Sequence, residues 1–161
     1  MSGRAGREAR NEKGGTPPFA SPKSGTWPQA FTWPVRVYYQ HTDAGGVVFH
    51  ANYFSFMECA RSELLQSLGF DLGELARRDH VLFVVHSAQI AYHKPALLND
   101  ALTVTARVKW VGRARLVFDQ AVMRGEEVLA SAELSLACVG AKSYRPVAVP
   151  EAIRKKLEGL R

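Results

Sequence analysis

The pattern of apolar and polar residues changes near residue 33 of the chain. Residues 1–30 are rich in Gly, Ser, Pro and Arg and show almost no apolar periodicity, which predicts a disordered tail. After this tail Val35, Val37 and Tyr39 fall at every second position. This alternation predicts a β-strand, and a Gly-containing loop is expected to follow at 43–49.

Residues 52–68 have the period of a helix. Their apolar side chains recur at spacings of three or four and form a wide stripe: Tyr53, Phe54, Phe56, Met57, Ala60, Leu64, Leu65 and Leu68. The width of the stripe predicts a helix that is buried on most sides. Asn52 is expected to cap its start, and Gly69 to end it in the left-handed conformation. A short helical turn is expected at 71–78.

Four β-branched segments follow, at about 80–94, 101–111, 114–124 and 127–140, with turn-forming residues between them. Their connections are too short for helical crossovers, so the segments are predicted to form an antiparallel meander. A short charged helix is expected at 151–160. The predicted fold class is therefore α+β, with an antiparallel sheet that curls around one long apolar helix.

Length and composition match a single compact domain over residues 31–161, since the chain has 161 residues and is 47% apolar. No transmembrane segment or secretory leader is recognised, so a cytoplasmic protein is expected. About half of the net charge of +6 lies in the tail, and no nucleic-acid-binding pattern accompanies it. Nucleic acid is therefore not an expected partner. Both cysteines, Cys59 and Cys138, are expected to be buried and unreactive.

The segment 41–50 gathers the residue types that carry chemistry, and it lies directly before the predicted helix. The first N–H groups of a helix lack internal partners, so they can stabilise a carbonyl oxygen that becomes negative. Asp43, on the preceding glycine loop, could act on that carbonyl carbon. Taken alone, such an aspartate is more often a turn former. A metal site of His41, Asp43 and His50 is not expected, because their spacing does not match the helical two-histidine motif.

Longer segments resemble the YbgC-type acyl-CoA thioesterases associated with the Tol-Pal system, within the wider family that includes 4-hydroxybenzoyl-CoA thioesterase. The resemblance covers about residues 33–158 and rests on 35–39, 42–53, 58–63, 91–96, 100–104, 145–146 and 149–150. It implies a hotdog fold, in which an antiparallel sheet wraps around the helix at 52–68. It also implies hydrolysis of acyl-CoA without a cofactor, in a homodimer or a homotetramer of two dimers.

The same resemblance implies roles for individual residues. Asp43 falls on the family's catalytic aspartate, as nucleophile or general base, and His50 on the residue whose backbone N–H polarises the thioester carbonyl. Tyr39, Asn52 and Tyr53 lie in the same motif and are candidate substrate-binding residues. Independently of the resemblance, the phosphates of CoA need cations, and Lys94, Arg113 and Arg115 near predicted strand ends are the candidates. One departure is His41, because family members commonly carry an acidic residue there.

Glu58 is an alternative catalytic residue, since a second hotdog lineage uses a helix glutamate at about this position. A local ion pair with Arg61 would explain Glu58 equally well. Two other functions stay open. One is a dehydratase or hydratase that uses His50 with Glu58; the other is a non-catalytic module that binds acyl carrier protein, with the basic tail as a tether. The loop motif favours hydrolysis through Asp43.

Overall fold

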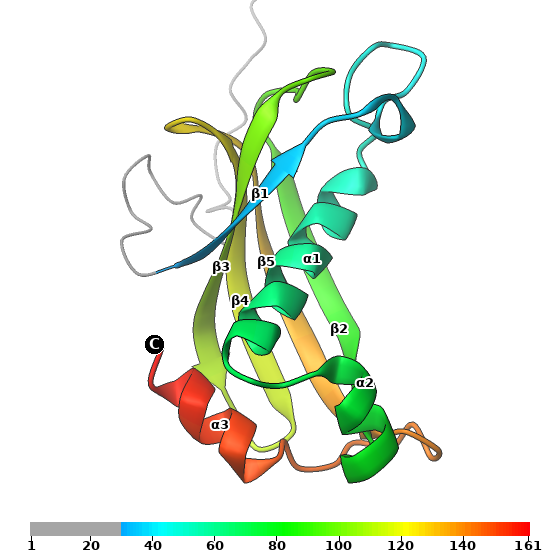
Figure 1. The fold of residues 1–161 in the computed structure, drawn as a ribbon, viewed down its shortest axis with the longest axis vertical. Helices are drawn as coiled ribbons and strands as arrows, with labels where there is room; N and C mark the ends of the chain where they lie inside the picture. The colour runs from blue at the N-terminus through cyan, green and yellow to red at the C-terminus, as the bar shows by residue number, and fades with distance from the viewer. Residues whose placement is uncertain (1–29) are drawn as a thin grey trace, which may run out of the picture.

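A five-stranded antiparallel sheet with one long helix across it makes up most of the described chain, residues 30–161 of the computed structural model (Figure 1). The expected tail falls, apart from Ala30, outside the described residues. The strands are β1 Phe31–Arg36, β2 Val81–Tyr92, β3 Ala101–Val111, β4 Arg115–Arg124 and β5 Glu127–Gly140. The helices are α1 Asn52–Ser67, α2 Leu72–Glu74, which continues into the π-turn Leu75–Asp79, and α3 Glu151–Glu158.

The order of the strands is β1-β3-β4-β5-β2, so the predicted meander holds only for β3, β4 and β5. The prediction is wrong for β2, which pairs with β5 and has no partner on its other edge among the described strands. The 93–100 connection must therefore pass three strand positions, about 14 Å, to reach β3. A connection of that length reaches so far easily.

The first strand begins and ends earlier than predicted. β1 pairs with β3 from Phe31 opposite Ala106 to Arg36 opposite Ala101, where β3 itself begins. Beyond that point no strand partner continues, and the segment Tyr39–His41 forms a 3-10 turn instead. The expectation that the strand includes Val37 and Tyr39 is wrong because pairing, and not local alternation, decides where the strand ends.

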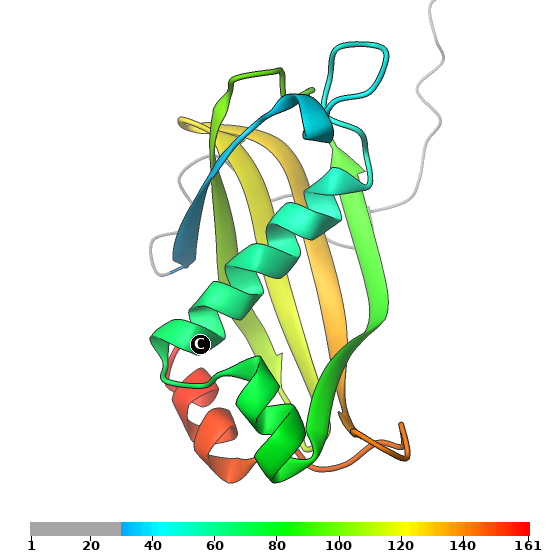
Figure 2. The ribbon, with the colours of Figure 1, turned by 45° about the vertical axis from the view of Figure 1, so that its right-hand side comes forward.

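The long helix α1 matches the predicted span and lies over β1, β3 and β4 (Figure 2). Its N-cap is Ala51 and not Asn52 as expected, because the Asn52 side chain bonds outside the helix. Gly69 does adopt the left-handed conformation, at φ 89°. One broad face of α1 is buried: Tyr53, Phe56, Met57, Ala60, Arg61, Leu64 and Leu65. The opposite face of α1 is exposed and carries Cys59. The expectation that Cys59 is buried is therefore wrong. The expectation that Cys138 is buried is confirmed.

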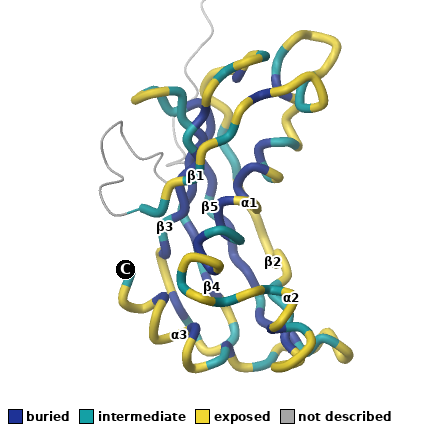
Figure 3. Tube along the Cα trace, viewed as in Figure 1, coloured by how far each residue is buried: buried dark blue, intermediate teal, exposed yellow. Residues whose placement is uncertain are grey.

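The edge strand β2 stands apart from the other strands in its exposure. Figure 3 shows β2 largely exposed, while much of β3, β4 and β5 is buried. Six successive β2 residues, 84–89, are exposed on both faces of the strand. At the far end of the sheet, α3 covers the core with Ile153 and Leu157. No helix within residues 30–161 is both long and apolar enough to span a bilayer.

Candidate functional site

The loop that carries Asp43 is closed by its own backbone. Thr42 and Val48 form an antiparallel bridge, and the Asp43 N–H donates to the carbonyl oxygen of Val47 at 2.9 Å. Gly46 turns the chain with a φ of 77°, a conformation that favours glycine. Gly46 therefore has a local structural reason, which is to allow the turn of this loop.

The carboxylate of Asp43 is exposed and uses one oxygen for the loop. Its Oδ1 accepts a hydrogen bond from the Gly45 N–H at 2.7 Å. Its Oδ2 has no partner among the described residues. The turn-forming role expected from residue preference is thus present, and it fixes the orientation of the carboxylate while one oxygen stays available to a reactant.

The loop is tied to the start of α1 through the backbone oxygen of His41. This oxygen accepts hydrogen bonds from the Phe49 N–H at 2.9 Å and from the Asn52 side-chain amide at 2.7 Å. The His41 ring itself accepts from the Tyr38 N–H at Nδ1 and meets Phe56 edge-on at 5.0 Å between centroids. The imidazole that departs from the family pattern therefore binds the turn and the helix.

The residues just before α1 present unused N–H groups. Neither the His50 N–H nor the Ala51 N–H donates to an acceptor in the described part of the chain. Both lie at the positive end of the α1 dipole, which favours negative charge on a bound oxygen. Two backbone donors with no acceptor among residues 30–161 therefore lie at this helix start.

A pocket of about 300 Å³, called here the tyrosine pocket, opens beside these N–H groups. It is lined by Val48, His50, Tyr53, Tyr92, His93, Lys94 and Pro95. The Tyr53 hydroxyl accepts from the Ala96 N–H at 2.9 Å, and burial raises the pKa of Tyr53 above its usual value. Three predicted site residues, His50, Tyr53 and Lys94, thus meet in one place.

Two lining residues, Tyr92 and His93, were not singled out from the sequence. Both lie in the 91–96 segment that contributes to the family resemblance, which was the available signal. Lys94 forms an ion pair with Glu127. Tyr39 and Asp43 are exposed residues of the neighbouring loops and do not line the pocket.

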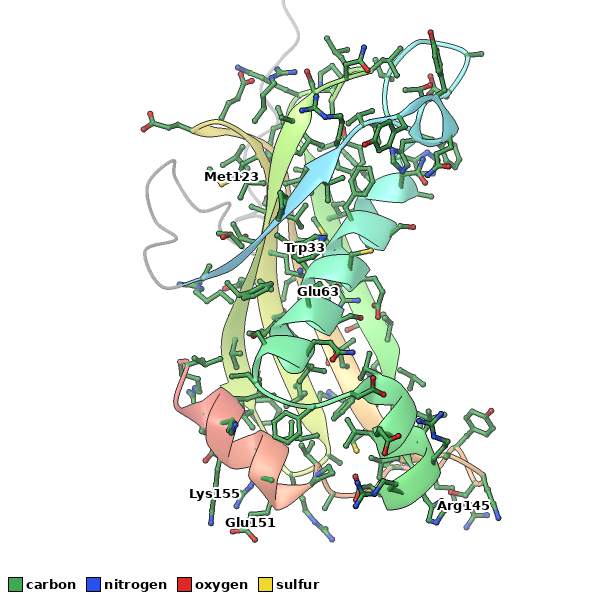
Figure 4. All side chains as sticks on the ribbon, in the orientation of Figure 1. Trp33, Glu63, Met123, Arg145, Glu151 and Lys155 are labelled. Carbon is green, nitrogen blue, oxygen red and sulfur yellow. The ribbon has the colours of Figure 1, made fainter. Side chains whose placement is uncertain are left out.

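The remaining candidates lie elsewhere. Arg113 lines a separate pocket beside the start of α3, and Arg115 lies within 3.2 Å of the His86 ring. Both belong to the end of the sheet near α3, where Figure 4 labels Arg145, Glu151 and Lys155, far from the Asp43 loop. One chain therefore does not bring Lys94 together with the two arginines.

Glu58 lies in a second hollow, called here the helix-face cavity, of about 500 Å³. Its lining is Phe54, Ser55, Glu58, Cys59, Arg61, Val85 and Leu134. Glu58 pairs with Arg61, as the local alternative predicted. Arg61 is buried, and it also donates to Gln120 at 2.6 Å. Burial lowers the pKa of Arg61, while Glu58 opposes that shift.

Comparison with known proteins decides the family. The family model described as the thioesterase superfamily matches residues 45–131, more than half of the chain. The chain belongs to the thioesterase superfamily. The acyl-CoA thioesterase YbgC of Haemophilus influenzae is 40% identical over 131 residues, which cover 81% of this chain and 96% of that protein. The acyl-CoA thioester hydrolase YbgC of Escherichia coli O6:H1 is 40% identical over 124 residues, which cover 76% of this chain and 92% of that protein.

A solved structure agrees with this membership of the thioesterase superfamily. A probable thioesterase from Bartonella henselae superposes with a TM-score of 0.73 at 32% identity and covers 75% of this chain and 99% of its own. The predicted α+β class and hotdog fold are confirmed, as is the resemblance to YbgC thioesterases. In this superfamily member, residues 30–161 contain no group of three or more His, Cys, Asp or Glu side chains arranged to hold a metal ion.

Proposed function

We propose that the chain hydrolyses acyl-CoA thioesters, so that acyl-CoA and water give a free acid and CoA. Relatives named for this activity are 40% identical over more than nine-tenths of their own length. The structural observation that carries the proposal is the Asp43 carboxylate, held by Gly45 with one oxygen available, on a loop tied to the helix start. The N–H groups of His50 and Ala51, which donate to no acceptor among the described residues, lie at that start.

The proposed chemistry needs only these groups. The thioester carbonyl oxygen accepts a hydrogen bond from the His50 N–H and gains negative charge as the carbon is attacked, which the α1 dipole stabilises. Asp43 either attacks the carbonyl carbon, giving an anhydride that water opens, or takes a proton from an attacking water. In both routes the C–S bond breaks and CoA leaves as a thiolate that takes up a proton.

The other candidate residues divide into supports and contacts. Asn52 and Tyr53 are proposed to support the site, because their polar groups already bind His41 and Ala96. Lys94 is proposed to meet a phosphate of CoA at the edge of the tyrosine pocket. Tyr39 is exposed next to the Asp43 loop and is proposed to contact the substrate there.

A second copy of the chain is proposed to complete the site through pairing along β2. This strand has an open edge, exposes Val84 and Val85, and borders the helix-face cavity; such edges favour pairing with another chain. Antiparallel pairing about a two-fold axis would place the Val81 end of one copy beside the Tyr92 end of the other. The arginines at the far end, Arg113 and Arg115, would then approach the tyrosine pocket of the second copy. Light scattering should give the mass of two or four chains, and a monomer would contradict this arrangement.

Replacing Asp43 by Asn tests the reaction. The amide keeps an oxygen for the Gly45 N–H, so the loop is preserved, while the nucleophile or base is lost. Thiol release from a panel of acyl-CoA and acyl carrier protein substrates should fall by about two or more orders of magnitude. Full turnover by Asp43→Asn would refute the assignment.

Glu58→Gln is the matched control, because it also converts a carboxylate to an amide in the same helix-and-loop region. Its thiol release should stay within a few-fold of the parent, whereas its inactivity beside an active Asp43→Asn would move the chemistry to the helix-face cavity. Incubation with crotonyl-CoA separates hydration from hydrolysis. Loss of the enoyl absorbance without free thiol would support the hydratase alternative instead.

A further inference from the structure

Tyr92 links the edge strand to the start of the long helix. It is the last residue of β2, and its hydroxyl donates a hydrogen bond to the backbone oxygen of His50 at 2.9 Å. Its ring meets Tyr53 edge-on, with centroids 5.3 Å apart and an interplanar angle of 79°. Tyr53 is held in turn by the Ala96 N–H. The ring of Tyr92 is therefore packed against a side chain that is itself held in place.

The hydrogen bond from Tyr92 to the His50 oxygen orients a whole peptide group. A peptide group is planar, so the His50 carbonyl and the Ala51 N–H share one plane and point in opposite directions. Holding the carbonyl therefore aims the Ala51 N–H. The neighbouring plane, which carries the His50 N–H, is held in the same way because the Phe49 carbonyl accepts from the Asn52 N–H at 2.9 Å. The two N–H groups that have no acceptor among residues 30–161 are thus both held in place through the carbonyl oxygens of their own peptide groups.

The hydroxyl also acts on the strength of these donors. A hydrogen bond to a peptide oxygen polarises the whole group and makes its N–H a better donor. Burial, and then the neighbouring Tyr53, raise the pKa of Tyr92, so the hydroxyl keeps its proton through the neutral and mildly alkaline range. Tyr92 can therefore donate this hydrogen bond throughout that pH range.

We infer that Tyr92 is a positioning residue that holds and polarises the His50–Ala51 peptide, so that its N–H can meet the thioester carbonyl together with the His50 N–H. This role rests on the proposed function. The Tyr92 ring also forms a wall of the tyrosine pocket, and that contribution does not depend on the hydroxyl. The two contributions can therefore be separated by removing the oxygen alone.

Tyr92→Phe is the variant that does so. Loss of the hydrogen bond that orients the His50–Ala51 peptide should lower kcat for thiol release about tenfold. A tenfold change in rate corresponds to about 1.4 kcal/mol in the activation free energy. KM should stay within about twofold because the ring wall remains. Tyr144→Phe is the matched control: Tyr144 is 68% exposed at the far end of the molecule, and its hydroxyl has no hydrogen-bond partner among the described residues. It should change neither constant.

A spectroscopic measurement separates positioning from folding. With turnover blocked by Asp43→Asn, the carbonyl stretch of a bound isotope-labelled acetyl-CoA should lie below its value in water, and adding Tyr92→Phe should return part of that shift. An unchanged kcat and carbonyl frequency in Tyr92→Phe would overturn the role of Tyr92 while leaving Asp43 intact. A raised KM with unchanged kcat would also overturn it, by making Tyr92 only a wall. Absence of thiol release by the parent protein would overturn both proposals together.

Discussion

At the scale of one residue, the turn-forming contact of Asp43 is compatible with the reactive role proposed for the same side chain. Its Oδ1 accepts from Gly45 in the loop, and this bond fixes the direction of Oδ2, which has no partner in the described part of the chain. The turn-forming role expected from residue preference and the catalytic role implied by the family motif therefore do not exclude each other at this position. The sequence could place the candidate loop directly before the helix because loop, glycines and helix start are neighbours along the chain.

Residues whose roles depend on distant contacts were not predictable in this way. Tyr92 and His50 are 42 positions apart, and only the folded chain brings the hydroxyl to the backbone oxygen. Cys59 was expected to be buried because it lies among apolar neighbours, yet it faces outward from α1. Which face of a helix is covered depends on what the sheet, or another chain, places against it.

Cys138 leads to a prediction about alkaline stability. Burial raises the pKa of its thiol from 9.0 to about 11, so the folded chain keeps the proton that the unfolded chain loses first. The contribution is fully present below pH 9 and is lost as the pH rises from 9 to about 11, to a limit of about 2–3 kcal/mol. Urea unfolding at pH 8 and pH 10.5 should show part of this loss in the free energy of unfolding.

Substitution separates this thiol from other groups that titrate in the same range. Cys138→Ala should show a smaller difference between the two pH values than the parent. Cys59→Ala, which removes the exposed thiol, should keep the full difference. Equal pH dependence in the parent and in Cys138→Ala would show that the buried thiol is not responsible.

At the scale of elements, periodicity within a segment predicted α1, α3 and the strands β3 to β5 closely. The errors concern the limits of β1 and the place of β2 in the sheet, and both depend on strand partners. β1 ends where β3 begins, and β2 pairs with β5 rather than with the next strand along the chain. Strand pairing joins distant residues, so alternation shows that a strand exists but not what lies beside it.

The junction between α1 and the sheet gives a second prediction. Gln120 on β4 accepts from the buried Arg61 and donates to the backbone oxygens of Met57 and Thr105. Gln120→Leu leaves these groups without that partner and should cost about 2–3 kcal/mol of the free energy of unfolding. Urea unfolding measures this loss. The protein concentration must be held fixed, because association between chains makes the apparent free energy of unfolding depend on concentration.

A double variant tests the reason for that loss. Arg61→Met combined with Gln120→Leu removes the buried charge together with its partner, so the pair should lose less than the sum of the single variants. Gln66→Leu, on the exposed side of α1, should change stability by only about 0.5 kcal/mol or less. Strict additivity of Arg61→Met and Gln120→Leu would contradict a coupled network.

At the scale of the whole molecule, the open edge of β2 predicts association. Val85 is 52% exposed and lies in the middle of that edge, at the border of the helix-face cavity. Val85→Arg would place a long cation in the proposed contact and should shift the solution mass toward one chain, with loss of most thiol release. Light scattering and the thiol assay on the same samples measure both effects.

The opposite edge of the sheet supplies the matched control. Thr32→Arg introduces the same side chain on β1, also at an exposed position of an edge strand. It should leave mass and turnover unchanged. If Val85→Arg kept both the parent mass and the parent turnover, pairing through β2 would be excluded. The sequence could not predict this surface, because it becomes visible only when β2 is found at the edge.

The position of Tyr92 at the end of β2 has a consequence for regulation. The strand proposed to pair with another copy and the residue whose hydroxyl is proposed to orient the His50–Ala51 peptide belong to one element, because β2 ends at Tyr92. If both proposals hold, a change at that edge on pairing would alter the hydrogen bond from Tyr92 to His50, and with it the peptide before α1. Assembly and turnover would then be coupled quantities, and the specific activity of this protein would depend on its own abundance.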